Sequence, residues 1–403
     1  MTFTIHTGDC REIMATLPES SVDTIICDPP YGLAFMGKDW DQQVPGPDYW
    51  RAALRVAKPG AMLLAFGGTR TFHRLTVAIE DAGWEVRDVL SWLYGSGFPK
   101  SMAIDKAIDK AAGAAREVLG HGAPRKDESH SLNKSGMGVA GARATYTAPA
   151  TDLAKRWLGW GTALKPAWEP IILAMKPLDG TFADNAQRHG VAGLAIDAGR
   201  VGNGPSPSAA MRANGAVPMR ADDGTPYTTS STWKDAGAGE ALGRWPANVL
   251  LDEVAAAQLD EQSGVSESPD ASRPIVRGDR TNPIYGGQPN AAGTIGAGYG
   301  DTGGASRFFY VAKASRSDRG TGNDHPTVKP IDLMRYLCRL TKTPTGGVVL
   351  DPFTGSGSTG VAALIEGRDF IGCELDPHNA GIARHRCAEA DPIGTQQTIG
   401  GVA

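Results

Sequence analysis

Four residues suited to hold a planar amine follow an apolar run near the N-terminus. Asp28, Pro29, Pro30 and Tyr31 come directly after "VDTIIC" (22–27), which predicts a short buried strand. The Asp28 carboxylate and the Pro29 carbonyl are hydrogen-bond acceptors, proline brings no N–H of its own to compete, and tyrosine offers a flat ring for stacking. Taken alone, the same stretch also fits an acid that caps a loop and two prolines that end a strand.

A glycine-rich turn lies more than three hundred residues later. Gly355, Gly357 and Gly360 form a G-x-G-x-x-G after the predicted strand 346–353 and before a predicted helix. Such glycines let the backbone approach a ligand closely, and the helix N-terminus offers free N–H groups. The next predicted strand carries Glu374, an acid placed to hold ribose hydroxyls. By themselves the glycines also fit a dinucleotide site, or a turn that binds nothing.

The elements that must position these two motifs lie at opposite ends of the chain. Near the N-terminus the patterns predict strands at 22–28, 61–68 and 85–95, and helices at 49–60 and 71–84. Near the C-terminus they predict helices at 329–341, 359–367 and 378–390, and strands at 346–353 and 369–375. This alternation of strands and helices predicts an α/β doubly wound fold.

The middle of the chain has a different texture. Residues 111–165 and 180–305 are rich in Gly, Ala, Ser, Pro and Asn and have weak periodicity, which predicts long, partly mobile loops with short strands. Ordered islands are expected at 167–177, 244–259 and 306–315.

Composition indicates a globular protein without a strong charge. The chain has 403 residues, 41% of them hydrophobic and 21% charged, with a net charge of −4. Any nucleic-acid binding must therefore use local basic patches. The five cysteines are scattered without a C-x-x-C, which argues against a disulfide framework or a zinc site. No metal is expected. The charged N-terminus and the short apolar runs predict a cytoplasmic protein without membrane segments.

Together, "DPPY" and "DPFTGSGSTG" resemble the amino-group DNA methyltransferases that use S-adenosylmethionine. The catalytic motif precedes the cofactor motif, as in the circularly permuted β class of this family. The resemblance extends to "GDCREIM", "SGFPKS", "AWEPIILAMKP" and "HPTVKP". It implies a Rossmann-like, S-adenosylmethionine-dependent methyltransferase fold with an inserted target-recognition region, of bacterial or prophage type.

The resemblance also implies a domain layout. A catalytic half would cover 1–110, a loop-rich insertion and return strand 111–176, the target-recognition region 177–320, the cofactor-binding half 321–390, and a flexible tail 391–403.

Residue roles can be carried over from the family motif by motif. Asp28, Pro29, Pro30 and Tyr31 would be catalytic, with Tyr31 stacked on a flipped base. The expected cofactor-binding residues are Asp9, Asp28, Thr327, Lys329, Asp351, Phe353, Gly355, Ser356, Gly357, Ser358 and Glu374. Asp9 would lie near the cofactor adenine, whereas Thr327 and Lys329 would reach its carboxylate. A cytosine C5 enzyme would need a Pro-Cys nucleophile, and the sequence has no such pair.

Double-stranded DNA is the implied partner, and basic residues in the middle region are the candidates for contacting it. Lys313, Arg316, Arg319 and Arg244 are expected at phosphates or bases, although any one of them also fits ordinary surface charge. A homodimer and a companion restriction endonuclease are further partners that the family allows.

The leading interpretation is an adenine N6 DNA methyltransferase, because a serine in place of Asp28 is more typical of cytosine enzymes of the β class. A cytosine N4 methyltransferase shares the fold and the mechanism. A non-catalytic DNA-binding subunit, and a nicotinamide-dependent oxidoreductase based on the glycines alone, explain fewer of the motifs. RNA or protein glutamine substrates are further alternatives, the glutamine enzymes usually having asparagine in place of Asp28.

Overall fold

The computed structural model describes residues 1–33, 41–97, 101–121, 145–202, 243–268, 275–276, 295–296, 300–313, 315–320, 322–325 and 328–390. The chain divides into two compact units. The larger consists of Met1–Gly95 with Trp168–Ala403, and the smaller of Ser96–Ala167. The smaller unit thus begins before the predicted boundary at residue 110, and the return strand belongs to the larger unit. None of the described helices is both long and apolar enough to span a bilayer.

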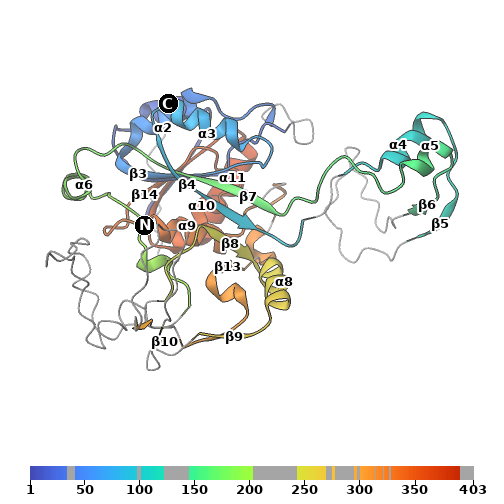
Figure 1. Cartoon of the computed structure of the whole chain (residues 1–403). Helices are drawn as coiled ribbons and strands as arrows, with labels where there is room; N and C mark the ends of the chain where they lie inside the picture. The colour runs from blue at the N-terminus through green and yellow to red at the C-terminus, as the bar shows by residue number, and fades with distance from the viewer. Residues whose placement is uncertain are drawn as a thin grey trace. The chain divides into compact units, whose positions relative to one another are not determined.

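A sheet of nine strands organises the larger unit, in the order β1-β15-β14-β2-β3-β7-β4-β8-β13 (Figure 1). Neighbouring strands are parallel except at β7, which runs antiparallel to both β3 and β4. The strands of this sheet are β1 (Phe3–Thr7), β2 (Val22–Cys27), β3 (Ala57–Phe66), β4 (Glu85–Leu93), β7 (Trp168–Met175), β8 (Val249–Asp252), β13 (Tyr310–Ala312), β14 (Val348–Asp351) and β15 (Asp369–Glu374).

The helices of the larger unit follow the strands in an α/β manner. They are α1 (Cys10–Thr16), α2 (Pro47–Val56), α3 (Phe72–Asp81), α6 (Phe182–His189), α8 (Glu253–Ser263), α9 (Ile331–Leu340), α10 (Ser358–Ile365) and α11 (Pro377–Ala390). Short 3₁₀ turns cover Asp197–Gly199, Ala305–Phe308 and Arg316–Arg319. Two-stranded pairs join β9 (Ser266–Glu267) to β12 (Thr302–Gly303) and β10 (Ile275–Val276) to β11 (Ile295–Gly296).

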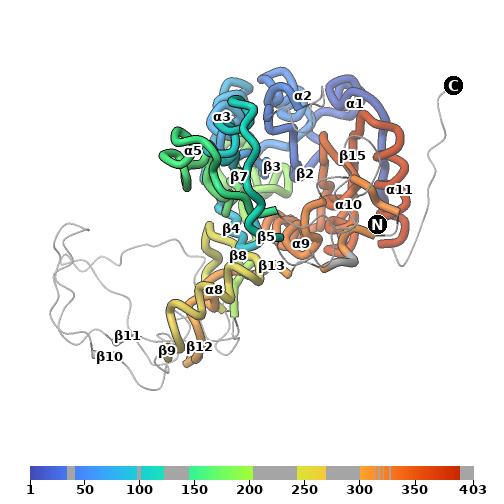
Figure 2. Tube along the Cα trace, turned by 90° about the vertical axis from the view of Figure 1, so that its right-hand side faces the viewer, coloured from blue at the N-terminus to red at the C-terminus, as the bar shows by residue number. Residues whose placement is uncertain are grey.

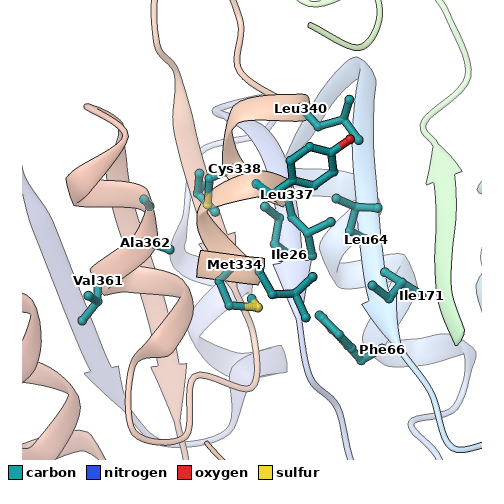
Figure 3. Close-up of a cluster of buried hydrophobic side chains, with 14 of the residues drawn as sticks. Ile26, Leu64, Phe66, Ile171, Met334, Leu337, Cys338, Leu340, Val361 and Ala362 are labelled. Atoms are coloured by element: carbon teal, nitrogen blue, oxygen red, sulfur yellow. The ribbon is translucent and has the colours of Figure 1, made fainter. Parts of the chain in front are cut away.

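Helices cover both faces of the sheet, so the larger unit has three layers. The set α1, α2 and α3 packs on one face and the set α9, α10 and α11 on the other (Figure 2). Because strand residues alternate between faces, Ile25 enters the first core and Ile26 the second. Figure 3 shows the second core, where Ile26, Leu64 and Phe66 meet side chains of α9 and α10. Burial on both faces explains why β2 reads as a continuous apolar run.

The two ends of the chain meet between β14 and β2. These strands pair in parallel, with Leu350 opposite Ile25. Asp23 accepts a hydrogen bond from the backbone N–H of Val348 at 2.8 Å, and the fully buried Arg368 donates to Thr24 Oγ1 at 2.8 Å. The predicted doubly wound α/β fold, and the predicted meeting of its two halves in the permuted order, are confirmed.

Two details differ from the sequence prediction. The helix expected over 49–60 ends at Val56, and β3 begins at once at Ala57. Pro59 cannot continue a helix. Gly60, which lies within β3, adopts a φ of +76°. In the middle region β7, β8 and α8 form at the predicted islands, whereas α6 forms outside them, where loops were expected.

The smaller unit contains α4 (Ile104–Ala111), α5 (Asp152–Arg156) and a hairpin of β5 (Val118–His121) with β6 (Thr145–Thr147). Its interior is polar. Arg116 bridges Asp105 at 2.7 Å and Asp109 at 2.5 Å. Burial opposes a charge on Asp109, but hydrogen bonds from Ala150 and Thr151 and the charge of Arg116 lower the pKa of Asp109 to about 2. This network holds the N-terminus of α5 to α4.

Candidate active site

The two sequence motifs meet at the carboxyl edge of the sheet. Asp28 follows the end of β2, and Asp351 closes the adjacent strand β14. The chain leaves β14 towards α10 on one face and leaves β2 towards α2 on the other. This is the point at which the winding of a doubly wound sheet reverses, and ligands of such sheets bind outside the strand ends there.

Asp28 lies in a cluster of four polar side chains drawn from distant parts of the chain. Its Oδ2 is 2.8 Å from Lys329 Nζ, and its Oδ1 accepts a hydrogen bond from the Tyr31 hydroxyl at 2.7 Å. Glu169 Oε2 is 3.1 Å from Lys329 Nζ and 3.4 Å from the Tyr31 hydroxyl oxygen. Lys329 therefore lies between two carboxylates, and both oxygens of Asp28 have partners.

The cluster is electrostatically balanced around Lys329. Burial would lower the pKa of Lys329, but the charges of Asp28 and Glu169 and their hydrogen bonds outweigh burial and raise it. Burial and the same two carboxylates raise the pKa of Tyr31 well above its ordinary value. The ammonium is also 4.9 Å from the centroid of the Phe66 ring. Lys329 is thus charged and Tyr31 is neutral at physiological pH.

A buried carboxylate shapes the loop after the prolines. Asp41 accepts hydrogen bonds from the backbone N–H groups of Tyr31, Gly32 and Leu33 at 2.7, 2.9 and 3.2 Å. Thr71 Oγ1 donates to the carbonyl oxygen of Tyr31 at 2.6 Å. With its backbone fixed on both sides, the Tyr31 side chain is held at Asp28.

The glycine-rich turn has the backbone that its sequence predicts. Gly355 and Gly357 have φ values of +54° and +85°, in the left-handed region, and Gly357 is the N-cap of α10. The Gly355 N–H donates to Glu374 Oε2 at 2.8 Å, which fixes the acid at the end of β15 beside the turn. Asp351 accepts from the Phe353 N–H at 2.9 Å.

Burial gives Asp351 unusual proton affinity. Loss of solvation, reinforced by the nearby charges of Asp28 and Glu374, raises the pKa of Asp351 to about 7, even though hydrogen bonds from Thr359 and Phe353 favour its charged form. Burial also raises the pKa of Glu374. Because the folded protein holds a proton on Asp351 more tightly than the unfolded chain does, this carboxyl should reduce stability as pH rises from about 4 to about 7.

Asp351→Asn should remove that pH dependence. The unfolding free energy of the variant minus that of the wild type should rise by roughly 3 kcal/mol between pH 4 and pH 7, because only the wild type must ionise a buried acid. The changed hydrogen bond to Thr359 adds an offset that does not depend on pH. Urea unfolding of both proteins across this range measures the difference, and a constant difference would contradict a raised pKa.

Several predicted cofactor residues turn inward in this structure. Arg386 on α11 donates to the backbone oxygen of Ser356 at 2.5 Å and to its hydroxyl at 3.0 Å, and it reaches the Ser358 hydroxyl at 3.4 Å. Both serine hydroxyls thus brace the turn against α11. The Phe353 ring packs near the rings of Tyr49 and Trp50, with centroids 6.0 and 6.1 Å apart.

Asp9 caps α1 at the same edge of the sheet. It accepts a hydrogen bond from the Arg11 N–H at 2.8 Å and pairs with the Arg11 guanidinium at 2.6 Å. The hydrogen bond from the Arg11 side chain lowers the pKa of Asp9. Gly8 donates to the Glu374 carbonyl at 2.9 Å, so Asp9 follows a residue that touches the end of β15.

The "HPTVKP" segment links the two motifs. A Cβ added to Gly355 would lie 3.2 Å from the His325 ring, and Lys329 four residues later contacts Asp28. Arg319 supports the segment by donating to the His325 carbonyl at 2.6 Å. Thr327 lies outside the described residues. The structure thus places Lys329 beside the Asp28 carboxylate. The contact of Lys329 with a cofactor carboxylate stays a prediction.

The basic residues predicted to contact DNA have different environments. Arg244 is only 7% exposed, pairs with Asp301 at 2.5 Å and lies over the Phe308 ring, and its contact with DNA stays a prediction. Arg319 holds the "HPTVKP" segment, and Lys313 is exposed. The Arg316 side chain lies outside the description.

Sequence reasoning missed Glu169, Asp41 and Arg386. Glu169 lies near the start of β7, within "AWEPIILAMKP". An acidic residue near the start of a buried strand was the signal that could have identified it as a site residue. Asp41 and Arg386 act through contacts that no local pattern reveals.

Comparison with known proteins finds similarity over part of the chain. Residues 216–385 match the model of the N6_N4_Mtase family, described as DNA methylase. The type II methyltransferase M2.DpnII of Streptococcus pneumoniae is 47% identical over 62 residues, which are 15% of this chain and 23% of that protein. The DNA adenine methyltransferase YhdJ of Escherichia coli is 45% identical over 53 residues, which are 13% of this chain and 18% of that protein. This chain therefore spans less than a quarter of the length of either relative.

A solved structure of M1.HpyAVI with SAM aligns over 96% of this chain and all of that one, with 14% identity and a TM-score of 0.39. The family match contains the glycine-rich turn and the "HPTVKP" segment, which are the parts that the fold brings to Asp28. Residues 216–385 are thus similar to the DNA methylase family.

Proposed function

We propose that the protein is a site-specific DNA methyltransferase that transfers a methyl group from S-adenosylmethionine to adenine N6 in double-stranded DNA. The observation that carries the proposal is the meeting of Asp28 and Tyr31 with the glycine-rich turn at the carboxyl ends of β2 and β14. An acceptor for an amine and a cradle for a nucleoside cofactor thus share one edge of the sheet.

The residues around the turn fit S-adenosylmethionine. Gly355 and Gly357 adopt the left-handed φ values that the turn requires, α10 begins there with its N-terminus at the sheet edge, and Glu374 stands at the end of the next strand for ribose hydroxyls. When bound, the cofactor supplies an electrophilic methyl group on a positively charged sulfur. The Asp28 carboxylate, on this edge, adds negative charge that suits such a ligand.

Asp28 and the loop that follows it would prepare the target amine. A base stacked in a duplex cannot reach the site, so it must be flipped out into it. The Asp28 carboxylate and the Pro29 carbonyl would then accept its two N–H groups and favour the geometry in which nitrogen forms the new bond. Tyr31 would stack on the base. The rest of the rate comes from alignment of nitrogen with the methyl group.

An amine that takes the place of Lys329 at Asp28 would release that ammonium, and Glu169 offers it an alternative partner. Each oxygen of Asp28 already has one partner, Lys329 at Oδ2 and the Tyr31 hydroxyl at Oδ1. Lys329 already contacts Glu169 at 3.1 Å and can keep that carboxylate when Asp28 turns to the substrate. Without Glu169, release of Asp28 would leave a buried ammonium unpaired. Glu169 is therefore a positioning residue in this account.

Glu169→Gln should lower kcat about ten- to a hundredfold, because Lys329 would then hold Asp28 more tightly. The dissociation constant for S-adenosylmethionine should change less, since Glu169 contacts only Lys329 and Tyr31 in this cluster. Steady-state kinetics with Glu85→Gln as the control, an exposed glutamate on the neighbouring strand β4, measures the effect. A variant that loses affinity for the cofactor but keeps kcat would contradict this role.

Adenine is favoured over cytosine by the aspartate at position 28, and the matched relative YhdJ is itself named a DNA adenine methyltransferase. Incubation of the purified protein with S-adenosylmethionine and unmethylated plasmid DNA, followed by mass spectrometry of the nucleosides, tests the proposal. N6-methyladenine is expected. N4-methylcytosine would overturn the choice of base, and an unmodified plasmid would overturn the activity. The homodimer, the companion endonuclease and the cytoplasmic location remain predictions.

A further inference from the structure

The smaller unit, Ser96–Ala167, carries its apolar side chains on the outside. Among its described residues, Ala154 is the one buried hydrophobic residue. Many of its large apolar side chains are exposed instead, among them Leu119, Leu153, Trp157, Leu158, Trp160 and Leu164. A unit of this size whose interior is an ion-pair network has an apolar surface suited to a partner.

The same unit is the basic part of the chain. It holds eleven Lys and Arg against six Asp and Glu, a net charge of +5. Since the whole chain carries −4, everything outside this unit carries −9. Residues 177–320, expected to recognise the target, hold thirteen basic and sixteen acidic residues. A protein that binds a polyanion needs a positive surface, and the charge is concentrated here.

Aromatic rings and cations are neighbours on this surface. The rings of Trp157 and Trp160 lie edge to face with centroids 5.3 Å apart, and the two residues are 40% and 61% exposed. Lys155 and Arg156, directly before them on α5, are exposed as well. Thr151 caps α5, and Asp109 holds Thr151 through two hydrogen bonds of 3.0 and 2.8 Å. The buried network thus fixes the helix that presents these residues.

We propose that Ser96–Ala167 is a duplex-DNA-binding unit, in which Lys155 and Arg156 face phosphates and Trp157 and Trp160 pack against the sugars and base edges. The inference rests on the proposed function, which requires DNA as the partner, and it assigns the contact to a part of the chain outside the catalytic sheet. Cations at phosphates supply binding to duplex DNA that does not depend on its sequence, and apolar side chains that contact the minor groove add to it.

Fluorescence anisotropy of a labelled duplex of arbitrary sequence, with the full-length protein at several salt concentrations, tests this unit. Lys155→Gln/Arg156→Gln should weaken binding roughly tenfold at low salt and reduce the salt slope by about 2, since each lost phosphate contact removes about 0.9. The matched control is Arg51→Gln/Arg87→Gln, which removes two exposed cations of the larger unit. The control should change affinity less than twofold.

Trp157→Ala/Trp160→Ala tests the apolar part of the surface, with light scattering as a second readout. Weaker DNA binding by both variant pairs, with unchanged S-adenosylmethionine binding, supports the proposal. Wild-type affinity in both pairs would overturn it, and so would a tryptophan variant that loses only self-association, which would make the surface an interface between copies. Failure of the wild-type protein to bind any duplex would instead refute the proposed function.

Discussion

Asp28→Ala should reduce the rate of methyl transfer by about a thousandfold or more, which is on the order of the loss when one polar contact to a transition state is removed from other enzymes. The affinity for S-adenosylmethionine should change only slightly. In the proposed mechanism Asp28 supplies the acceptor for the target amine, and Glu169, the other carboxylate of the cluster, lies on the far side of Lys329. The fold should survive, since Lys329 keeps Glu169 as a partner and β2 is buried on both faces without Asp28.

Transfer of a labelled methyl group to DNA measures the rate, and calorimetry measures cofactor affinity. Asp48→Ala is a matched control, because Asp48 is an exposed aspartate that pairs with Arg51 on the surface of α2. The control should keep wild-type activity. Activity of Asp28→Ala within tenfold of wild type would contradict the mechanism, and equal loss of transfer and cofactor binding would move the role of Asp28 to the cofactor.

Gly357→Val should abolish cofactor binding and destabilise the protein by about 2–5 kcal/mol, from left-handed strain and overpacking together. Gly357 has a φ of +85°, which a β-branched residue tolerates poorly, and a Cβ there would lie 3.0 Å from the Cα and Cβ of Ala383 on α11. The backbone of a packed helix cannot move aside cheaply. The turn would therefore lose its shape, and its backbone N–H groups would no longer point towards the cofactor.

Thermal unfolding and cofactor calorimetry of Gly357→Val measure the two effects. Gly381→Ala on α11 is the control, because nothing lies within 4 Å of a Cβ at that position and alanine favours a helix. The control should match or slightly exceed wild-type stability. A Gly357→Val protein that binds S-adenosylmethionine normally would show that the turn is not the cofactor site.

Local patterns explain why the core of the fold could be predicted. The run ending at Cys27 has to be a strand buried on both faces, and the glycines after Asp351 have to form a tight strand-to-helix turn. The resemblance carried by the order of the two motifs implies that the two halves meet, and the structure pairs Leu350 of β14 with Ile25 of β2. Asp28, Tyr31, Gly357 and Glu374 could be singled out as candidates because each lies near the end of a recognisable element.

The remaining contacts join residues that are far apart in the sequence, and no local sequence pattern indicates which of them will meet. Glu169 reaches Lys329 only because β7 lies between β3 and β4. Arg244 looked like a surface cation, yet Asp301 and Phe308 enclose it. The smaller unit was mistaken in part for loops, because an interior built from Asp105, Asp109 and Arg116 leaves no apolar periodicity to detect.

The most direct test of the central claim is sequencing of genomic DNA from cells that lack their own DNA methylation and express this protein. A single-molecule method that detects modified bases reports both the base and its sequence context. We expect N6-methyladenine at one short recurring motif in cells with the wild-type protein, and none in cells with Asp28→Ala. Modification that persists in the variant, or no modified base from a wild-type protein that binds S-adenosylmethionine, would contradict the account.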